Sequence, residues 1–295
     1  NEELTVLGCT VDIQVTDGLA ELCEAGEVVT YTLKDRDGAT ATDFVGSLVL
    51  TTSTGNGDYV DNGANGTFDN GTSDDGTATY AFSSADNGVL SVTFSNSVAE
   101  TLTMEATGSG ITLDGASVDE ITFSACEFRI AYTDSDPGDS DVCSIESVQI
   151  GVYSSTGSLV TTYTGTVNLS TTTGNGTWAD PGGTALGTLT DPVAEDGSAT
   201  YEFVSGDNGQ VTLNFTDATN ETTNINVSDG VTTDPANNTD PNDPDLTVGL
   251  CTFQISFDGG ASANDAAVSA CEVQAVTITV RDRLGNISTD YTGTM

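Results

Sequence analysis

The six cysteines are the side chains best suited to chemistry in this chain, and they occur in pairs. Each of three similar stretches carries one pair: Cys9 and Cys23, Cys126 and Cys143, Cys251 and Cys271. The chain has no histidine, so a thiol nucleophile would lack its usual base and a zinc site its usual nitrogen ligand. The interval within a pair grows from stretch to stretch while the flanking sequences stay alike, which a disulfide tolerates and a metal site does not. We therefore predict the bridges Cys9–Cys23, Cys126–Cys143 and Cys251–Cys271, and an oxidising location that is extracellular or at the cell surface.

Carboxylates are the other abundant chemical groups. The chain has 45 Asp and Glu against 5 Lys and Arg, a formal net charge of −40. Nucleic acid and anionic membranes both require a basic surface, so neither is expected as a partner. No apolar run is long enough for direct membrane insertion. Dense carboxylates suit hard cations, and we expect Ca²⁺ where they gather; a solvated acidic surface is the alternative interpretation.

Two acidic segments between the repeats are the candidate calcium sites. They hold Asp114, Asp119 and Glu120 in the first segment, and Asp229, Asp234, Asp240, Asp243 and Asp245 in the second. A further acidic run, residues 134–141, lies inside the second cysteine pair. None of these segments matches the twelve-residue EF-hand loop, so the pattern indicates a class of ion and no defined geometry.

Residues for catalysis are scarce. Without histidine there is no ready general base, and acidic pairs are so frequent that none stands out. The Gly-Asn-Gly motifs at 55–57 and 174–176 are interpreted as turns, because no lysine follows as it does in a phosphate-binding loop. Tyr59 and Trp178 follow these turns at corresponding places and are either core aromatics or a sugar-stacking platform. The sequence favours a protein that is not an enzyme.

Segments of alternating apolar and polar residues must position these groups, and such segments predict half-buried strands. The pattern recurs after about 120 residues, the size of one β-sandwich. Strands are predicted at 9–15, 126–132 and 251–257; 29–33, 148–152 and 276–280; 48–50 and 167–169; 78–82 and 199–203; 90–94 and 211–215; 102–106 and 225–227; and near 67–68 and 188–189. No segment has helical periodicity. We predict an all-β fold of tandem immunoglobulin-like antiparallel β-sandwiches with one disulfide per repeat.

The repeats divide the chain into domains. We predict immunoglobulin-like repeats at 1–110 and 121–229, a partial repeat at 246–295, and acidic linkers at 111–120 and 230–245. The partial repeat holds the first two strands and the start of the third, and two strands do not bury an apolar face by themselves. Either the natural chain continues past residue 295 or another copy supplies the missing strands, and we expect a head-to-tail contact between copies at residues 246–295.

Several motifs resemble bacterial extracellular Ig-like tandem repeats. They are Cys271-Glu-Val-Gln-Ala-Val-Thr-Ile-Thr-Val280, Tyr163-Thr-Gly-Thr-Val-Asn-Leu-Ser-Thr171, Gly174-Asn-Gly-Thr-Trp178 and Asp196-Gly-Ser-Ala-Thr-Tyr-Glu-Phe203. The resemblance is to repeats of large MSHA-pilus-associated surface proteins and, more loosely, of invasin-type adhesins. It implies a structural extracellular protein that forms a surface filament, a fibre or an adhesin stalk. The alternatives are a module that binds glycan or a cell-surface receptor, and an accessory region of a larger secreted enzyme.

Overall fold

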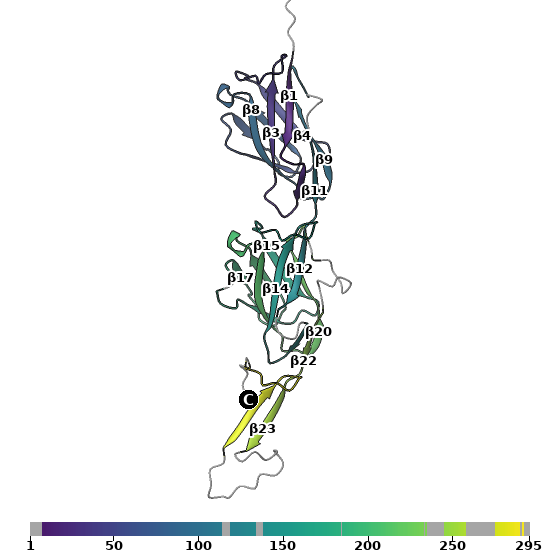
Figure 1. Ribbon diagram of the computed structural model, residues 1–295, viewed down its shortest axis with the longest axis vertical. Helices are drawn as coiled ribbons and strands as arrows, with labels where there is room; N and C mark the ends of the chain where they lie inside the picture. Colours follow the sequence, from purple (N-terminus) through teal and green to yellow (C-terminus); the bar gives the residue numbers. More distant parts are fainter. Residues whose placement is uncertain are drawn as a thin grey trace, which may run out of the picture. The chain divides into compact units, whose positions relative to one another are not determined.

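The computed structural model describes residues 8–113, 119–133, 138–183, 185–232, 234, 245–257, 275–289 and 291. The chain forms two compact units. Unit 1 comprises residues 1–126 and 154–162, and unit 2 comprises residues 127–153 and 163–295. Their regular structure consists of β-strands and two short 3-10 turns (Figure 1). The predicted all-β fold is confirmed.

Unit 1 contains two sheets that share one core. The first sheet runs in the order β10 (Ile111–Leu113), β1 (Cys9–Val15), β3 (Glu27–Lys34), β8 (Val89–Ser95) and β5 (Asp58–Asp61). The second runs in the order β2 (Leu19–Glu21), β11 (Glu120–Ser124), β9 (Thr101–Thr107), β4 (Ser47–Thr52), β7 (Thr77–Ala81) and β6 (Thr67–Asp69). Neighbouring strands are antiparallel except for β1 with β10 and β11 with β2, which are parallel.

The core of unit 1 follows from the alternation of side chains along each strand. On β3, Val29, Tyr31 and Leu33 are fully buried, and on β4 the same holds for Leu48 and Leu50. These residues belong to one hydrophobic cluster, to which both sheets contribute side chains. The half-buried strands that the alternation predicts are therefore confirmed here, and the fold is a β-sandwich of the immunoglobulin type.

Unit 2 repeats this plan. The first sheet runs in the order β12 (Glu127–Tyr132), β14 (Glu146–Tyr153), β19 (Gln210–Thr216) and β16 (Thr177–Ala179). The second runs in the order β17 (Thr188–Thr190), β18 (Ala199–Glu202), β15 (Thr166–Thr171) and β21 (Ile225–Ser228). A third, smaller sheet contains β13 (Asp139–Asp141), β22 (Leu246–Gly249) and β20 (Glu221–Thr223). The strand that is continuous as β9 in unit 1 is divided here into β20 and β21. The residues after Cys251 add a hairpin of β23 (Thr252–Phe257) and β24 (Val276–Arg281).

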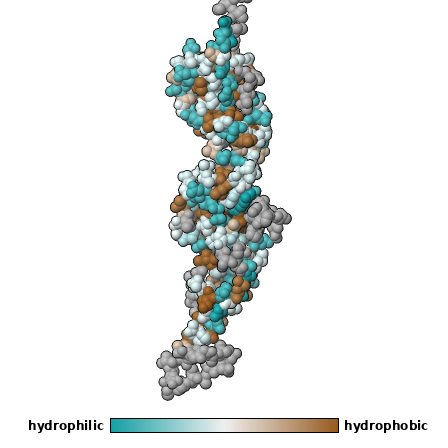
Figure 2. All heavy atoms as spheres, in the orientation of Figure 1, coloured by the Kyte–Doolittle hydropathy of each residue, from teal (hydrophilic) through white to brown (hydrophobic). Residues whose placement is uncertain are grey.

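The hairpin leaves an apolar face open to solvent among the described residues. Phe253 is 53% exposed, Ile255 44%, Val276 52% and Ile278 43%. Figure 2 shows apolar side chains over this part of the chain. The corresponding positions on β1 and β3 are buried because a second sheet covers them, so the exposure marks a half-built sandwich.

The Gly-Asn-Gly turns are structural. Gly57 and Gly176 have φ of 99° and 110°. A Cβ at these glycines would approach the rings of Phe94 and Phe215 to 2.1 and 2.2 Å. Only glycine allows both this backbone conformation and this close approach. In the described part of the chain, no helix is long and apolar enough to cross a membrane.

Candidate functional site: the disulfide joints

The cysteines pair between repeats. Cys23 bonds to Cys126, and Cys143 bonds to Cys251, with Cα–Cα distances of 6.0 and 6.1 Å. The predicted bridges Cys9–Cys23, Cys126–Cys143 and Cys251–Cys271 are therefore wrong. Each bridge joins the second cysteine of one repeat to the first cysteine of the next. Cys9 is a free thiol, and Cys271 lies outside the described residues.

The sheets explain the pairing. Cys9 opens β1 in the first sheet of unit 1 and donates its amide to the carbonyl of Gly110. Cys23 follows β2, which belongs to the other sheet and pairs with β11. The chain continues from β11 to Cys126, whose sulfur accepts a hydrogen bond from the amide of Cys23 at 3.2 Å. Neighbours in sequence thus lie in different sheets, whereas residues about 100 apart meet at adjacent strands.

We call the two disulfide regions joint one and joint two. Joint one comprises Leu19–Cys23, Glu120–Cys126 and residues 154–158, all within unit 1. Joint two comprises Asp139–Cys143, Leu246–Cys251 and residues 282–286, all within unit 2.

A short strand precedes the later cysteine of each bridge, Cys126 or Cys251, and enters a sheet. In joint one, β11 pairs parallel with β2 and antiparallel with β9. In joint two, β22 pairs parallel with β13 and antiparallel with β20. Both strands bury two side chains to 2% exposure or less: Ile121 and Phe123 on β11, and Leu246 and Val248 on β22. Full burial of such a side chain contributes about 1.5–3 kcal/mol, so each joint combines a covalent bond with a small apolar anchor.

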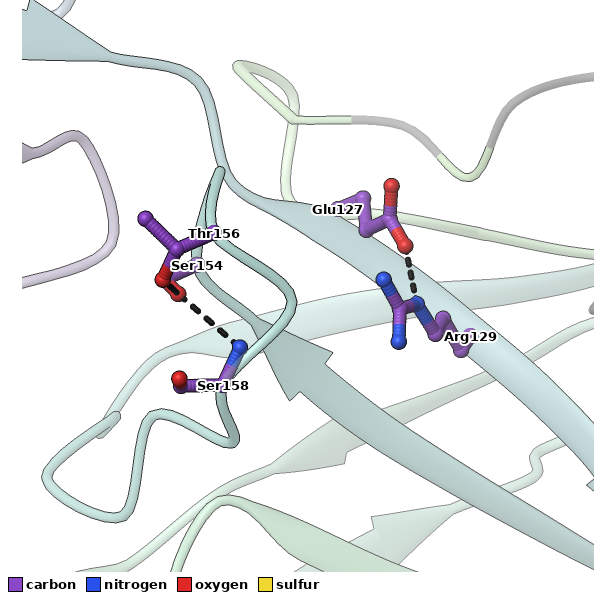
Figure 3. Close-up of polar contacts among 5 residues, drawn as sticks. All are labelled: Glu127, Arg129, Ser154, Thr156 and Ser158. Carbon is purple, nitrogen blue, oxygen red and sulfur yellow. Dashed lines mark hydrogen bonds and ion pairs between the residues drawn. The ribbon is translucent and has the colours of Figure 1, made fainter.

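A turn completes each joint, and Figure 3 shows the turn of joint one. In joint one the Ser154 hydroxyl accepts a hydrogen bond from the Ser158 amide at 3.1 Å. The next residue, Ser155, donates its hydroxyl and its amide to the carboxylate of Glu21 at 2.7 and 3.3 Å. The turn therefore presents its second residue to an acid two positions before the disulfide cysteine.

Joint two has the same kind of turn, and its second residue makes an ion pair where the turn of joint one makes hydrogen bonds. Asp282 Oδ1 accepts a hydrogen bond from the Asn286 amide at 2.6 Å. Arg283 then makes an ion pair with Asp139 at 2.6 Å and donates its amide to Asp141 at 3.3 Å. Two carboxylates of the acidic run 134–141, a candidate calcium segment, thus contact an arginine.

Most of the candidate calcium ligands that the structure describes contact the protein itself. Asp229 accepts hydrogen bonds from the amides of Val231 and Thr232, and also from the Tyr163 hydroxyl at 3.2 Å. Asp234 is 2% exposed and accepts the Val227 amide at 2.9 Å.

The remaining candidates are dispersed. Asp245 accepts a hydrogen bond from the Asn224 amide group at 3.4 Å. The Asp119 carbonyl accepts the Met104 amide, and Glu120 is an exposed residue of β11. The candidates Asp114, Asp240 and Asp243 lie outside the described residues. Within the described ranges, no three His, Cys, Asp or Glu side chains are grouped to hold a metal. Calcium binding stays a prediction.

The two aromatic candidates belong to the core. Tyr59 is 1% exposed and its ring lies 4.8 Å from that of Phe94; Trp178 is 3% exposed and lies 4.9 Å from Phe215. The Trp178 indole N–H donates to the carbonyl of Gly197. Because neither ring faces solvent, the sugar-stacking interpretation is wrong and the core interpretation is confirmed.

Sequence reasoning did not identify a half-buried carboxylate network beside the Gly-Asn-Gly turns. Glu100 Oε1 accepts hydrogen bonds from Thr54 at 2.9 Å and from Asn56 and Asn96 at 3.0 Å. Burial alone would raise the pKa of Glu100, but these donors hold it below its ordinary value. The repeated Asn of the motif is the signal for this network, because an equivalent contact joins Asn175 to Glu221.

Arg129, a basic residue of unit 2, contacts two neighbouring side chains. Arg129 on β12 pairs with Glu127 (Figure 3). Its guanidinium carbon lies 4.3 Å from the centre of the Tyr153 ring. The ion pair neutralises one of the five cations of the chain.

Comparisons with solved structures return bacterial surface proteins of low similarity. The adhesin InvE of Yersinia pseudotuberculosis is 15% identical, with 81% of this chain and 58% of that chain covered and a TM-score of 0.30. The Escherichia coli adhesin FdeC is 13% identical, covering 94% and 74%, with a TM-score of 0.28. Invasin, a bacterial integrin-binding protein, is 13% identical, covering 96% and 48%, with a TM-score of 0.34. The chain thus spans about half the length of InvE and invasin. No family model and no curated protein matches the chain.

Proposed function

We propose that the chain is a structural segment of an extracellular adhesin-like surface protein, built to carry tension. The observation that carries the proposal is the covalent path through the two joints. A force transmitted along the backbone crosses directly from Cys23 to Cys126 and from Cys143 to Cys251. Residues 24–125 and 144–250 then lie outside the loaded path, so most of each sandwich bears no load.

Other features support this role without being specific to it. Disulfides are formed in oxidising, extracellular compartments. A net charge of −40 keeps such a chain soluble and separate from other copies except where designed contacts exist. Assembly of copies into a filament through the open face of β23 and β24 is part of the proposal, because exposed apolar strands favour pairing with a further sheet.

Single-molecule force spectroscopy tests the load path. The intact chain is pulled from its two ends before and after reduction. Under oxidising conditions neither sandwich is expected to unfold to full length. Reduction should release about 370 Å for the 103-residue separation and about 390 Å for the 108-residue separation, at ~3.6 Å per extended residue.

A matched variant assigns each length. The double change Cys23→Ser and Cys126→Ser should release the first length without reductant and leave the second dependent on it. Equal extension of the oxidised and reduced wild-type chains would refute the proposed load path. Electron microscopy of concentrated protein tests filament formation separately, and dispersed single chains would contradict that part.

A further inference from the structure

The loop after β19 in repeat two contains a buried carboxylate oxygen with no donor. Asp217 begins this loop and is 4% exposed. Its Oδ1 accepts a hydrogen bond from the Thr219 amide at 2.7 Å. Its Oδ2 is buried and has no hydrogen-bond partner among the described residues. A buried, ionised oxygen is costly without a donor or a cation, so this atom points to a ligand that the described chain does not provide.

Two other carboxylates act on Asp217. Glu221 lies within hydrogen-bonding distance of it, and the charge of Glu195 also acts on it. Ionised carboxylates accept hydrogen bonds and donate none, so Glu221 does not satisfy Oδ2 at neutral pH. None of the ion pairs among the described residues involves these three acids. The loop therefore concentrates negative charge without a basic side chain to compensate it in the described part of the chain.

Hydrogen bonds hold the two neighbouring carboxylates in place. Glu221 accepts the Asn175 side-chain amide at 3.0 Å and the Thr173 hydroxyl. Glu195 accepts the Ala218 amide at 3.3 Å. Because the fold fixes both groups, they do not simply turn away from Asp217 to relieve the repulsion.

Solvent reaches this loop. Ala218, Thr219 and Asn220 are exposed, and Glu221 is half-buried. Carboxylate and water oxygens are the ligands that Ca²⁺ prefers, and Ca²⁺ accepts irregular sets of about six to eight of them. A hydrated cation can therefore approach Oδ2 of Asp217 from the open side of the loop.

Repeat one has the same network with one charge fewer. Asn96 stands at the place of Asp217 and donates its side-chain amide to Glu100 at 3.0 Å. Asp74 stands at the place of Glu195, with φ of 60° against 64°. An amide thus connects the network in repeat one, where repeat two has a carboxylate. The exchange of asparagine for aspartate converts a network that satisfies itself into one that requires a cation.

We propose that Asp217 and Glu221 bind a divalent cation of the Ca²⁺ type. The cation takes the role that the Asn96 amide group has in repeat one, Glu195 adds to the attracting potential, and water completes the coordination. With two protein carboxylates, binding belongs to the weak class of extracellular modules, with a Kd of about 1 mM. This site is separate from the acidic segments between the repeats, and it does not depend on whether the joints carry tension.

Trp178 gives the site a signal of its own. It is the only tryptophan of the chain, and its neighbour Thr177 pairs with Thr216, the residue before Asp217. Tb³⁺ occupies oxygen-rich Ca²⁺ sites and emits when a nearby indole is excited. Excitation of Trp178 in the full chain should therefore produce terbium emission. Ca²⁺ should displace this emission, and NaCl at equal ionic strength should not.

Asp217→Asn should abolish the emission. Glu202→Gln, which makes the same charge change at an exposed position of β18, should keep it. In urea unfolding followed by Trp178 fluorescence, about 10 mM Ca²⁺ should raise the folding equilibrium constant of the wild type about tenfold and leave that of Asp217→Asn unchanged. In EDTA, Asp217→Asn should be the more stable of the two, because its amide donates to Glu221.

Three results would overturn the proposal. They are equal terbium emission from Asp217→Asn and wild type, an equal response of the two to Ca²⁺ in urea unfolding, and a wild-type response that NaCl of the same ionic strength reproduces. The last result would show that the ion atmosphere of an acidic chain is sufficient.

A transfer of the site to repeat one is a second test. In the Asp217→Asn chain, Tyr59→Trp places an indole where Trp178 stands in repeat two, and this chain should give no terbium emission. Adding Asn96→Asp should restore the emission from repeat one. If repeat one is folded and the emission does not return, the aspartate is not what forms the site.

Discussion

Replacing Asp217 with asparagine is expected to stabilise repeat two. Asp217 occupies the place of Asn96 in the carboxylate network of repeat one. There, Asn96 accepts the Val98 amide and donates its own amide group to Glu100 at 3.0 Å. Asp217 likewise accepts the Thr219 amide at 2.7 Å, but its Oδ2 has no hydrogen-bond partner among the described residues. Instead of a donor, the site presents a second carboxylate to Glu221.

The pKa of Asp217 reports this conflict. Burial raises it above its ordinary 3.8, and the charges of Glu221 and Glu195 raise it further against the opposing effect of the Thr219 amide. A carboxyl with a raised pKa in the folded state costs stability once it is ionised. The cost begins as the pH rises above about 3.8 and is fully present above the folded pKa. It is therefore present at pH 7 and absent in acid.

The magnitude follows from the contact that repeat one makes. A hydrogen bond to a charged group contributes about 1.5–3 kcal/mol, so Asp217→Asn should add about 2 kcal/mol at pH 7. With a urea m-value of about 2 kcal/mol/M, the unfolding midpoint should rise by about 1 M. Near pH 3.5 the protonated carboxyl can itself donate to Glu221, and the difference from wild type should largely vanish.

Trp178 makes repeat two directly observable. It is the only tryptophan of the chain, it is 3% exposed, and its strand pairs with the strand that leads to Asp217. Urea unfolding followed by its fluorescence measures this repeat at both pH values. Glu202→Gln, on an exposed position of β18, removes one charge without entering the network and should change the midpoint little. An unchanged or lower midpoint for Asp217→Asn at pH 7, or the same gain at pH 3.5, would refute the reasoning.

Further predictions concern packing, ions and the joints. Phe203→Ala should destabilise repeat two by about 3–5 kcal/mol because Phe203 is 2% exposed, whereas Thr200→Ala should be nearly neutral; equal losses in Trp178 fluorescence unfolding would contradict the register. Removal of calcium with EDTA at physiological salt should lower the melting temperature if the acidic segments bind the ion, and an unchanged melting curve would reject that proposal. Arg283→Ala should weaken the Cys143–Cys251 bond in a glutathione buffer by no more than about 1 kcal/mol, because its ion pair with Asp139 is partly exposed. A larger loss would show that this ion pair contributes more to the joint than an exposed pair does.

The strands and the core were predictable because alternation is local information. A residue such as Tyr201 alternates with polar neighbours, and its fully buried position follows from that pattern alone. Each strand pattern also occurs in a second repeat, which supports the strand assignment independently. The short strands β2, β10 and β11 were not predicted, because three to five residues carry too little alternation to separate them from a turn.

The cysteine pairing was not predictable in the same way. Cys9 and Cys23 are near in sequence, but Cys9 begins β1 and Cys23 follows β2, and these strands belong to different sheets. Which sheet a segment joins is decided by long-range pairing, here of β11 with both β2 and β9. The one available signal was the motif that begins with an acid and recurs before Cys126 and Cys251, since a repeated apolar pair there indicates a strand of its own.

The joints are held mainly by a disulfide and buried apolar side chains, as expected for a chain with so few basic residues. Repeats with a net charge of −40 between them repel one another, and five basic residues are too few to join them by ion pairs. Joint one has Ser155 where joint two has Arg283, yet both keep the disulfide and the two buried anchors. Apolar burial and a covalent bond depend little on ionic strength, whereas surface ion pairs weaken as salt screens them. The joints are therefore expected to respond to redox conditions more strongly than to salt concentration.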